Sequence, residues 1–130
     1  FVPLVGYAML RGGVDKYGTT IPNYHYEDIW RLSEMYKEKK LKNPAVIVDA
    51  NHSNSNKKHH EQIRIVGEVL HTRKYNAELR KLIKGVMVES YLVDGRQDIG
   101  SHMVYGQSIT DPCIGWEDTV RLIDKIAEDC

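Results

Sequence analysis

The sequence predicts an α/β fold that is built on a parallel sheet. Apolar runs at residues 4–10, 45–48 and 85–89 lack the polar alternation of half-exposed strands, a pattern typical of strands buried in parallel sheets. A segment with apolar residues at helical spacing follows each run, and the last of these is residues 116–127. Such alternation of strands and helices predicts parallel strands that are joined by right-handed crossovers.

Residues that cap or break helices set the expected boundaries. The first strand ends at Arg11, and Asn23 is the expected N-cap of a helix at residues 26–40. The second helix is expected to begin near Asn56, with a break or a new cap at Asn76. The chain therefore has two crossover helices before its third strand.

The third strand and its surroundings are less regular. Gly85 is expected at the C′ position of the preceding helix, and the strand at residues 85–89 ends on a carboxylate. Residues 90–110 are polar, contain several glycines and show no clear element. Because so long a loop in a compact domain is usually functional, we expect residues 90–110 to serve a site.

Length and composition restrict the class of protein. The 130 residues suffice for one small domain, residues 1–130, and 18 basic against 18 acidic residues give no reason to expect nucleic acid as a partner. No apolar run approaches the ~20 residues of a membrane span, so we expect no membrane association. The two cysteines, Cys113 and Cys130, make no disulfide framework, which favours a cytoplasmic setting.

Polar side chains gather where the predicted strands end. Arg11 follows the first strand, Asp49 and His52 follow the second, Glu89 ends the third, and Asp111 lies in the loop that follows. The carboxyl ends of parallel strands meet on one face, where ligands and catalytic groups collect. An imidazole with carboxylates suits Mn, Fe, Co or Zn, and the planar fork of an arginine suits a phosphate or a carboxylate.

Each of these residues also has a simpler structural explanation. A single histidine in a polar loop such as His52 is usually a surface residue, and Asp111 could merely begin a turn with Pro112. The neighbouring lysines favour a solvated helix face for the pair His59 and His60. Only the joint placement of these residues at consecutive strand ends favours a metal site.

Five motifs resemble, in order, the C-terminal part of class I DAHP synthases, the 3-deoxy-D-arabino-heptulosonate 7-phosphate synthases (phospho-2-dehydro-3-deoxyheptonate aldolases). The last motif, which contains SITDPCIGWED, is long and specific. The motifs are residues 9–13 (MLRGG), 22–24 (PNY), 48–55 (VDANHSNS), 85–90 (GVMVES) and 105–118 (YGQSITDPCIGWED).

The resemblance implies a TIM (β/α)8 barrel that condenses phosphoenolpyruvate with erythrose 4-phosphate, the first step of the shikimate pathway. This chain would supply about three consecutive βα units, the C-terminal part of the barrel. On that mapping His52, Glu89 and Asp111 match three of the four ligands of a divalent metal. Arg11 matches an arginine that holds phosphoenolpyruvate, and His52 is the implied catalytic residue beside that substrate.

Several parts of the family's active site have no counterpart here. The fourth metal ligand is a cysteine on an early strand, which neither Cys113 nor Cys130 matches. The lysine-proline-arginine-threonine segment that grips erythrose 4-phosphate is missing, as are a lysine and a second arginine at the phosphoenolpyruvate site. We therefore expect this chain to be inactive alone.

Two functions remain open at this point. The first is the C-terminal portion of a DAHP synthase, and the alternative is a stand-alone, non-catalytic module that binds a metal or a phosphometabolite. A sister synthase that makes an eight-carbon sugar acid phosphate fits the SITDPCIGW motif less well. Because strands cut from a closed barrel have two unpaired edges, we also expect a homo-oligomer.

Overall fold

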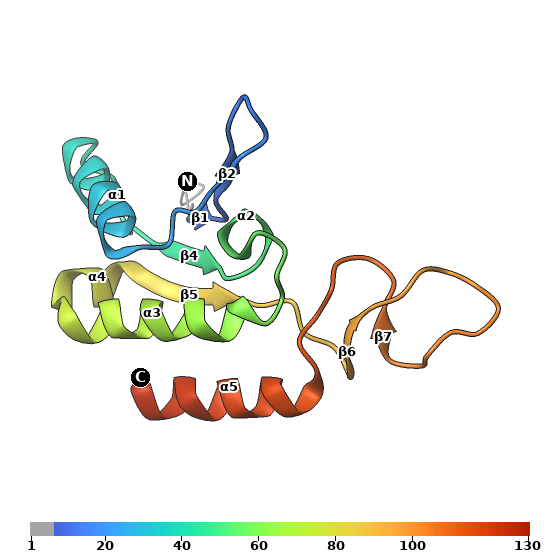
Figure 1. Cartoon of the computed structure of the whole chain (residues 1–130). Helices are drawn as coiled ribbons and strands as arrows, with labels where there is room; N and C mark the ends of the chain where they lie inside the picture. Colours follow the sequence, from blue (N-terminus) through green and yellow to red (C-terminus); the bar gives the residue numbers. More distant parts are fainter. Residues whose placement is uncertain (1–6) are drawn as a thin grey trace, which may run out of the picture.

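The centre of the molecule is a parallel sheet. The computed structural model describes residues 7–130, so residues 4–6 of the first predicted strand lie outside the described part. The three-stranded sheet has the order β1-β4-β5, with β1 at Ala8–Leu10, β4 at Val46–Asp49 and β5 at Ile83–Met87 (Figure 1). Both strand pairs are parallel, which confirms the predicted α/β class.

Helices follow each strand of this sheet. The first crossover is α1 (Tyr26–Glu38), and the second contains the short α2 (His52–Ser55), then α3 (Glu61–Tyr75) and α4 (Ala77–Leu82). The last helix, α5 (Trp116–Asp129), packs beside α3 (Figure 1).

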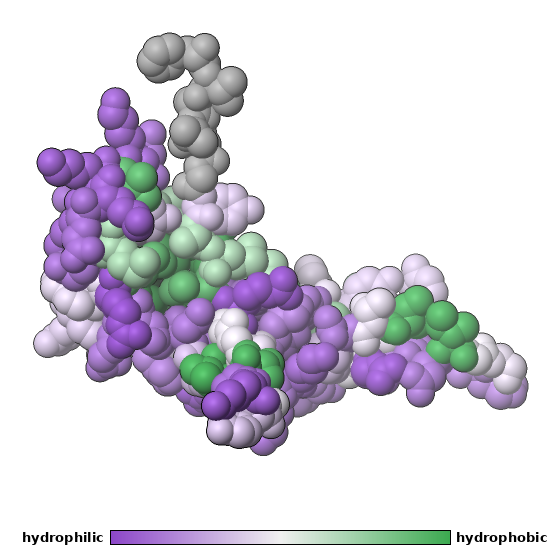
Figure 2. Space-filling view, turned by 90° about the horizontal axis from the view of Figure 1, so that it is seen from above, coloured by the Kyte–Doolittle hydropathy of each residue, from purple (hydrophilic) through white to green (hydrophobic). Residues whose placement is uncertain are grey.

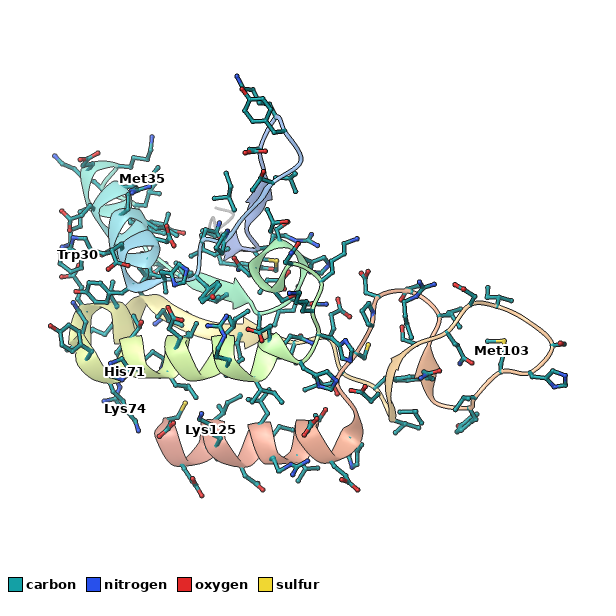
Figure 3. All side chains as sticks on the ribbon, viewed as in Figure 1. Trp30, Met35, His71, Lys74, Met103 and Lys125 are labelled. Atoms are coloured by element: carbon teal, nitrogen blue, oxygen red, sulfur yellow. The ribbon has the colours of Figure 1, made fainter. Side chains whose placement is uncertain are left out.

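Gly67 of α3 lies against a side chain of α5. Lys125 lies between the two helices (Figure 3), and its Nζ would be 3.0 Å from a Cβ at Gly67. A larger residue at this position would therefore meet the lysine side chain.

Two predicted helix starts differ from the structure. The N-cap of α1 is His25 rather than Asn23, because the Asn23 side chain accepts a hydrogen bond from the backbone nitrogen of Gly12. Asn56 has a left-handed φ of 52° and ends α2, so α3 begins at Glu61. Both asparagines are residue types that commonly cap helices. The observed starts of α1 and α3 instead follow a tertiary hydrogen bond and the backbone conformation.

The other boundaries of the second crossover are mixed. Asn76 re-caps the helix as predicted, since its side chain accepts from the backbone nitrogens of Glu78 and Leu79. Gly85 does not follow a helix end. It lies within β5, because Ile83 passes directly from α4 into the strand.

One face of the sheet carries the hydrophobic core. Val46 and Val48 are fully buried, together with Ile29 of α1, Ile65 of α3 and Leu79 of α4. Alternate strand residues point to the opposite face.

That opposite face is less covered. Met9 and Ile47, which pair across β1 and β4, are exposed and half-buried respectively. The prediction of strands covered on both faces therefore holds for only one face within residues 7–130 of this chain.

Two small ribbons extend from the body. The first pairs β2 (Gly13–Val14) with β3 (Thr20–Ile21). The second pairs β6 (Val93–Arg96) with β7 (Gln107–Ser108) in a projecting segment, here called the arm, which spans residues 91–112 (Figure 1). The long loop at 90–110 was predicted to have no clear element, and the structure corrects this with β6 and β7.

Apolar side chains are exposed on the arm as well as near the sheet. Figure 2 shows one hydrophobic area in the middle of the view and another on the arm, and Figure 3 labels Met103 in the loop of the arm. The exposed apolar residues of the arm include Tyr91, Leu92, Ile99, Met103, Val104 and Tyr105. Within residues 7–130, none of the helices has the length and apolar character to cross a lipid bilayer.

Candidate metal centre

The carboxyl ends of the three central strands carry the residues predicted for a site. Asp49 is the last residue of β4, and it pairs in register with Met87 of β5. Arg11 and Glu89 each lie two residues after Met9 and Met87, so alternation places them on the same, less covered face as Asp49. The sheet thus brings three of the chemically active side chains to one edge.

His52 is oriented by a buried carboxylate. It lies in the first turn of α2 with a left-handed φ of 47°, and its Nδ1 is 2.8 Å from Asp49 Oδ2. Asp49 is fully buried, and its Oδ1 accepts from the backbone nitrogen of Asn51 at 2.9 Å. Because an ionised carboxylate only accepts hydrogen bonds, neutral His52 carries its proton on Nδ1 and keeps a lone pair on Nε2.

The free nitrogen of His52 faces two further carboxylates. Its Nε2 lies 3.7 Å from Asp111 Oδ2 and 3.9 Å from Glu89 Oε1. One ligand atom of each residue lies within 4.8 Å of those of the other two, and all three residues are half-buried. The structure therefore brings together all three residues that the sequence nominated as metal ligands.

These donors fit a divalent transition metal. A ligating histidine whose second nitrogen donates to a carboxylate is the usual arrangement in protein metal sites. Imidazole with two carboxylates suits Mn, Fe, Co or Zn, and three protein ligands leave room for water or substrate. The donor set does not distinguish between these metals.

Arg11 stands beside this centre. Its Nε is 3.4 Å from Asp49 Oδ2, and half of its side chain is exposed. Among residues 7–130, Asp49 is the only ion-pair partner of Arg11. The guanidinium can therefore bind an anion at the strand ends, as a planar fork binds phosphate or carboxylate.

Gln62 is a supporting residue that sequence reasoning missed. It is fully buried in α3, where its Nε2 donates to Glu89 O at 3.1 Å and its Oε1 accepts from Glu89 N at 2.7 Å. These two bonds fix the backbone of a predicted ligand. The available signal was a polar residue three and four positions before Ile65 and Val66, on an otherwise apolar helix face.

Asn54 ties the strand ends to one another. Its Nδ2 donates to the carbonyl oxygens of Leu10 and Asp49 at 2.9 and 2.8 Å, and its Oδ1 accepts from Asn23 N at 2.8 Å. Asn54 is itself buried, so these bonds form in a region that excludes most water. The polar loop after β4 is therefore an ordered support for the site.

Gly12 allows the loop after β1 to approach this support closely. Its φ is +71°, and a Cβ there would lie 2.8 Å from the Cβ of Ser53. No real Cβ contact is that short, so the turn that places Arg11 needs glycine next to it.

Cys113 lies next to the centre, two residues after Asp111. Burial raises the pKa of its thiol, and the Glu89 and Asp111 carboxylates raise this pKa further, against a lowering by a hydrogen bond with Ser108. A raised pKa lowers the fraction of Cys113 that is thiolate, and with it the reactivity of this thiol.

Comparison with known proteins identifies the family of this chain. The sequence model of the DAHP synthetase I family matches residues 12–124. The chain belongs to this family. The match includes His52, Glu89 and Asp111, whereas Arg11 lies one residue before it begins.

Relatives in the DAHP synthetase I family are much longer than this chain. A phospho-2-dehydro-3-deoxyheptonate aldolase of Haemophilus influenzae is 43% identical over 122 residues, which are 92% of this chain and 31% of that protein. The Trp-sensitive enzyme of Escherichia coli K12 is 39% identical and covers 94% of this chain and 33% of its own length.

The family's fold is also matched. The structure of the phospho-2-dehydro-3-deoxyheptonate aldolase from Francisella tularensis aligns with a TM-score of 0.80 and 35% identity, covering 93% of this chain and 33% of that one. The chain spans about a third of the length of the relatives it matches.

Proposed function

We propose that the chain is the C-terminal part of a DAHP synthase barrel, about three consecutive βα units, and that it contributes a metal centre and an anion-binding arginine to the active site. The observation that supports this most strongly is the convergence of His52, Glu89 and Asp111 beside Arg11. The complete enzyme would be a transferase of the shikimate pathway that joins phosphoenolpyruvate to erythrose 4-phosphate.

Each residue has a distinct role in this proposal. His52, Glu89 and Asp111 hold the divalent metal, which when bound supplies a Lewis acid for the aldehyde of erythrose 4-phosphate. Asp49 keeps the proton of His52 on Nδ1, so that Nε2 stays available as a ligand. Arg11 neutralises charge on phosphoenolpyruvate, whose phosphate and carboxylate both suit a guanidinium.

The chain alone is expected to show no synthase turnover. Both substrates are phosphorylated anions, and Arg11 is the only cation that we assign to them in this chain. Positioning of two reactants supplies a large part of a bimolecular rate enhancement, and that positioning would need the rest of the barrel.

Both cysteines are free thiols, which supports the expected cytoplasmic location.

We also propose that the chain associates with itself. The less covered face of β1 and β4 carries Met9 and half-buried Ile47, and β1 and β5 are the sheet edges within residues 7–130. Such edges and faces pair with another copy most simply as a two-fold dimer. Light scattering over a dilution series tests this, and a single species near the chain's own 15.0 kDa at micromolar concentration would contradict it.

A chimeric enzyme tests the catalytic role. The C-terminal third of the Haemophilus influenzae enzyme is replaced by this chain, and formation of DAHP from both substrates is measured with Mn²⁺ present. We expect turnover that is lost with His52→Ala, Glu89→Ala or Arg11→Ala. His71→Ala, an exposed change on α3 (Figure 3), is the matched control and should leave the rate unchanged.

Metal binding by the chimera separates the possible outcomes. A folded chimera that binds Mn²⁺ but makes no DAHP would contradict the catalytic proposal and favour the alternative of a non-catalytic binding module. Retention of full activity in His52→Ala would contradict the assignment of the centre itself.

A further inference from the structure

A second cluster of metal-ligating side chains lies at the base of the arm. His59 and His60 precede α3, and Asp94 lies on β6. The Nε2 atoms of His59 and His60 are 3.2 and 3.3 Å from the same atom, Asp94 Oδ2. One ligand atom from each residue lies within 4.8 Å of the other two.

These separations match the ligand spacing around a tetrahedral ion. Two ligand atoms that are each about 2.05 Å from a tetrahedral metal lie about 3.3 Å apart. The other close histidine–carboxylate pairs of this structure are shorter, with His25–Glu68 at 2.6 Å and His52–Asp49 at 2.8 Å. His59 Nε2 is also 3.2 Å from Asp94 Oδ1, so His59 makes long hydrogen bonds with both oxygens at a spacing that an ion can span.

His60 has the orientation of a metal ligand. Its Nε2 faces Asp94, while its Nδ1 is directed toward Asp118 Oδ2 at 4.0 Å. This separation is longer than a hydrogen bond, so Asp118 lies near the outer nitrogen without fixing its tautomer. Asp118 keeps this oxygen available because its other oxygen, Oδ1, accepts from Arg121 at 2.8 Å.

The cluster joins segments that are far apart in the sequence. The first turns of α3 and α5 lie at the same end of the molecule, next to the base of the arm (Figure 1). His59 and His60 come from the segment before α3, Asp94 from the arm and Asp118 from α5. An ion held here would tie the arm to the body.

We propose that His59, His60 and Asp94 form a second divalent-metal site, of the zinc class, that holds the arm in place. Two imidazoles and a carboxylate suit Zn²⁺ or Co²⁺, with water as a fourth ligand. The sequence had indicated a solvated face for both histidines, yet the His59 side chain is only 19% exposed. This site shares no residue with the candidate centre at His52.

Metal stoichiometry tests the proposal directly. Metal-stripped protein is titrated with Zn²⁺ by calorimetry, and the parent chain is expected to bind two ions. The double variant His59→Ala with His60→Ala and the variant His52→Ala should each bind one. Asp94→Asn, which preserves side-chain shape, should also lose the second ion, whereas the exposed His102→Ala should retain both.

Proteolysis tests whether the ion holds the arm. Trypsin can cleave after Arg96 of β6, whose side chain is 48% exposed, and His52→Ala protein leaves only the second site for Zn²⁺. When the free Zn²⁺ concentration is ten times the dissociation constant, about one molecule in eleven is metal-free. If trypsin cuts only molecules whose arm is loosened, cleavage therefore slows about tenfold. Cleavage after Lys16, in the turn between β2 and β3, should not change.

Two results would overturn the proposal. The site does not exist if His52→Ala protein binds no Zn²⁺, or if the double variant binds as many ions as the parent. The clamping role is wrong if Zn²⁺ leaves the rate of cleavage after Arg96 unchanged in His52→Ala protein that has bound one ion.

Discussion

Replacing Asp49 by asparagine should move the proton of His52 to its metal-facing nitrogen. Asp49 Oδ2 now accepts from His52 Nδ1 at 2.8 Å, and Oδ1 accepts from Asn51 N at 2.9 Å. In Asp49→Asn the amide oxygen can keep the bond from Asn51, which turns the amide NH₂ toward Nδ1. Because that NH₂ can only donate, Nδ1 must become the acceptor and Nε2 must carry the proton.

The size of the effect follows from the role of Asp49. Changes to the carboxylate that orients a ligating histidine typically cost about 10- to 100-fold in metal affinity, which is about 1.4–2.7 kcal/mol. Asp49 is fully buried, and Arg11 Nε is only 3.4 Å from it. The substitution removes a negative charge and also changes the tautomer of His52, so we expect a loss of metal affinity in the upper half of this range. The backbone should be preserved, since the side chains are nearly the same size.

Calorimetric titration with Mn²⁺ measures this loss. It is best made in protein that also carries His59→Ala and His60→Ala, so that only the centre at His52 is counted. Asp15→Asn is the matched control, because Asp15 Oδ1 also accepts backbone hydrogen bonds, from Tyr17 N and Thr19 N, but lies in the turn between β2 and β3. Binding by Asp49→Asn within about twofold of the parent would refute the tautomer argument.

Two further changes probe the surroundings of the site. Gly12→Ala should lower the free energy of unfolding by roughly 1–3 kcal/mol in urea titrations, because φ is +71° and the new Cβ would lie 2.8 Å from Ser53 Cβ. Gly13→Ala, with nothing within 4 Å of its Cβ, should change it little, and equal effects would contradict the packing argument. Iodoacetamide at pH 8 should alkylate exposed Cys130 before Cys113, because burial raises the pKa of the Cys113 thiol and so lowers its thiolate fraction at that pH. The alkylation rate of Cys113 should continue to rise as the pH approaches that raised pKa. Mass spectra that show Cys113 alkylated faster than Cys130 would contradict this prediction.

The strand ends were predictable because their signal is local. Each of the three central strands is a short apolar run, and the polar residue that ends it is next to it in the sequence. Parallel pairing then brings the ends together without any further information. Arg11, Asp49 and Glu89 therefore share one edge in the structure as the sequence predicted.

The missed features depend on contacts between distant residues. Asparagine is a common N-cap residue, but the side chain of Asn23 accepts a hydrogen bond from Gly12 N instead. The backbone nitrogen of Asn23 donates to Asn54 Oδ1. The strand β7 has two residues, too few to show any periodicity, and it exists only through its pairing with β6. His59 lies 35 residues from its partner Asp94, so its lysine neighbours gave the wrong impression of a solvated face.

The three predicted ligands are fixed to different degrees, and this decides which part of the centre is most sensitive. His52 is held by buried Asp49, and Glu89 is held through its backbone by Gln62 and by Ile114 N at 3.0 Å. Asp111 has no comparable side-chain support among the described residues.

The position of Asp111 depends on the pairing at the base of the arm. There Gly95 and Cys113 exchange backbone hydrogen bonds of 2.8 and 3.1 Å. Glu89 lies just before the arm, Asp111 lies near the C-terminal end of the arm, and Asp94 lies one residue before Gly95. An ion at His59, His60 and Asp94 would therefore restrain the segment that carries Asp111, which gives the second site a structural reason to influence the first.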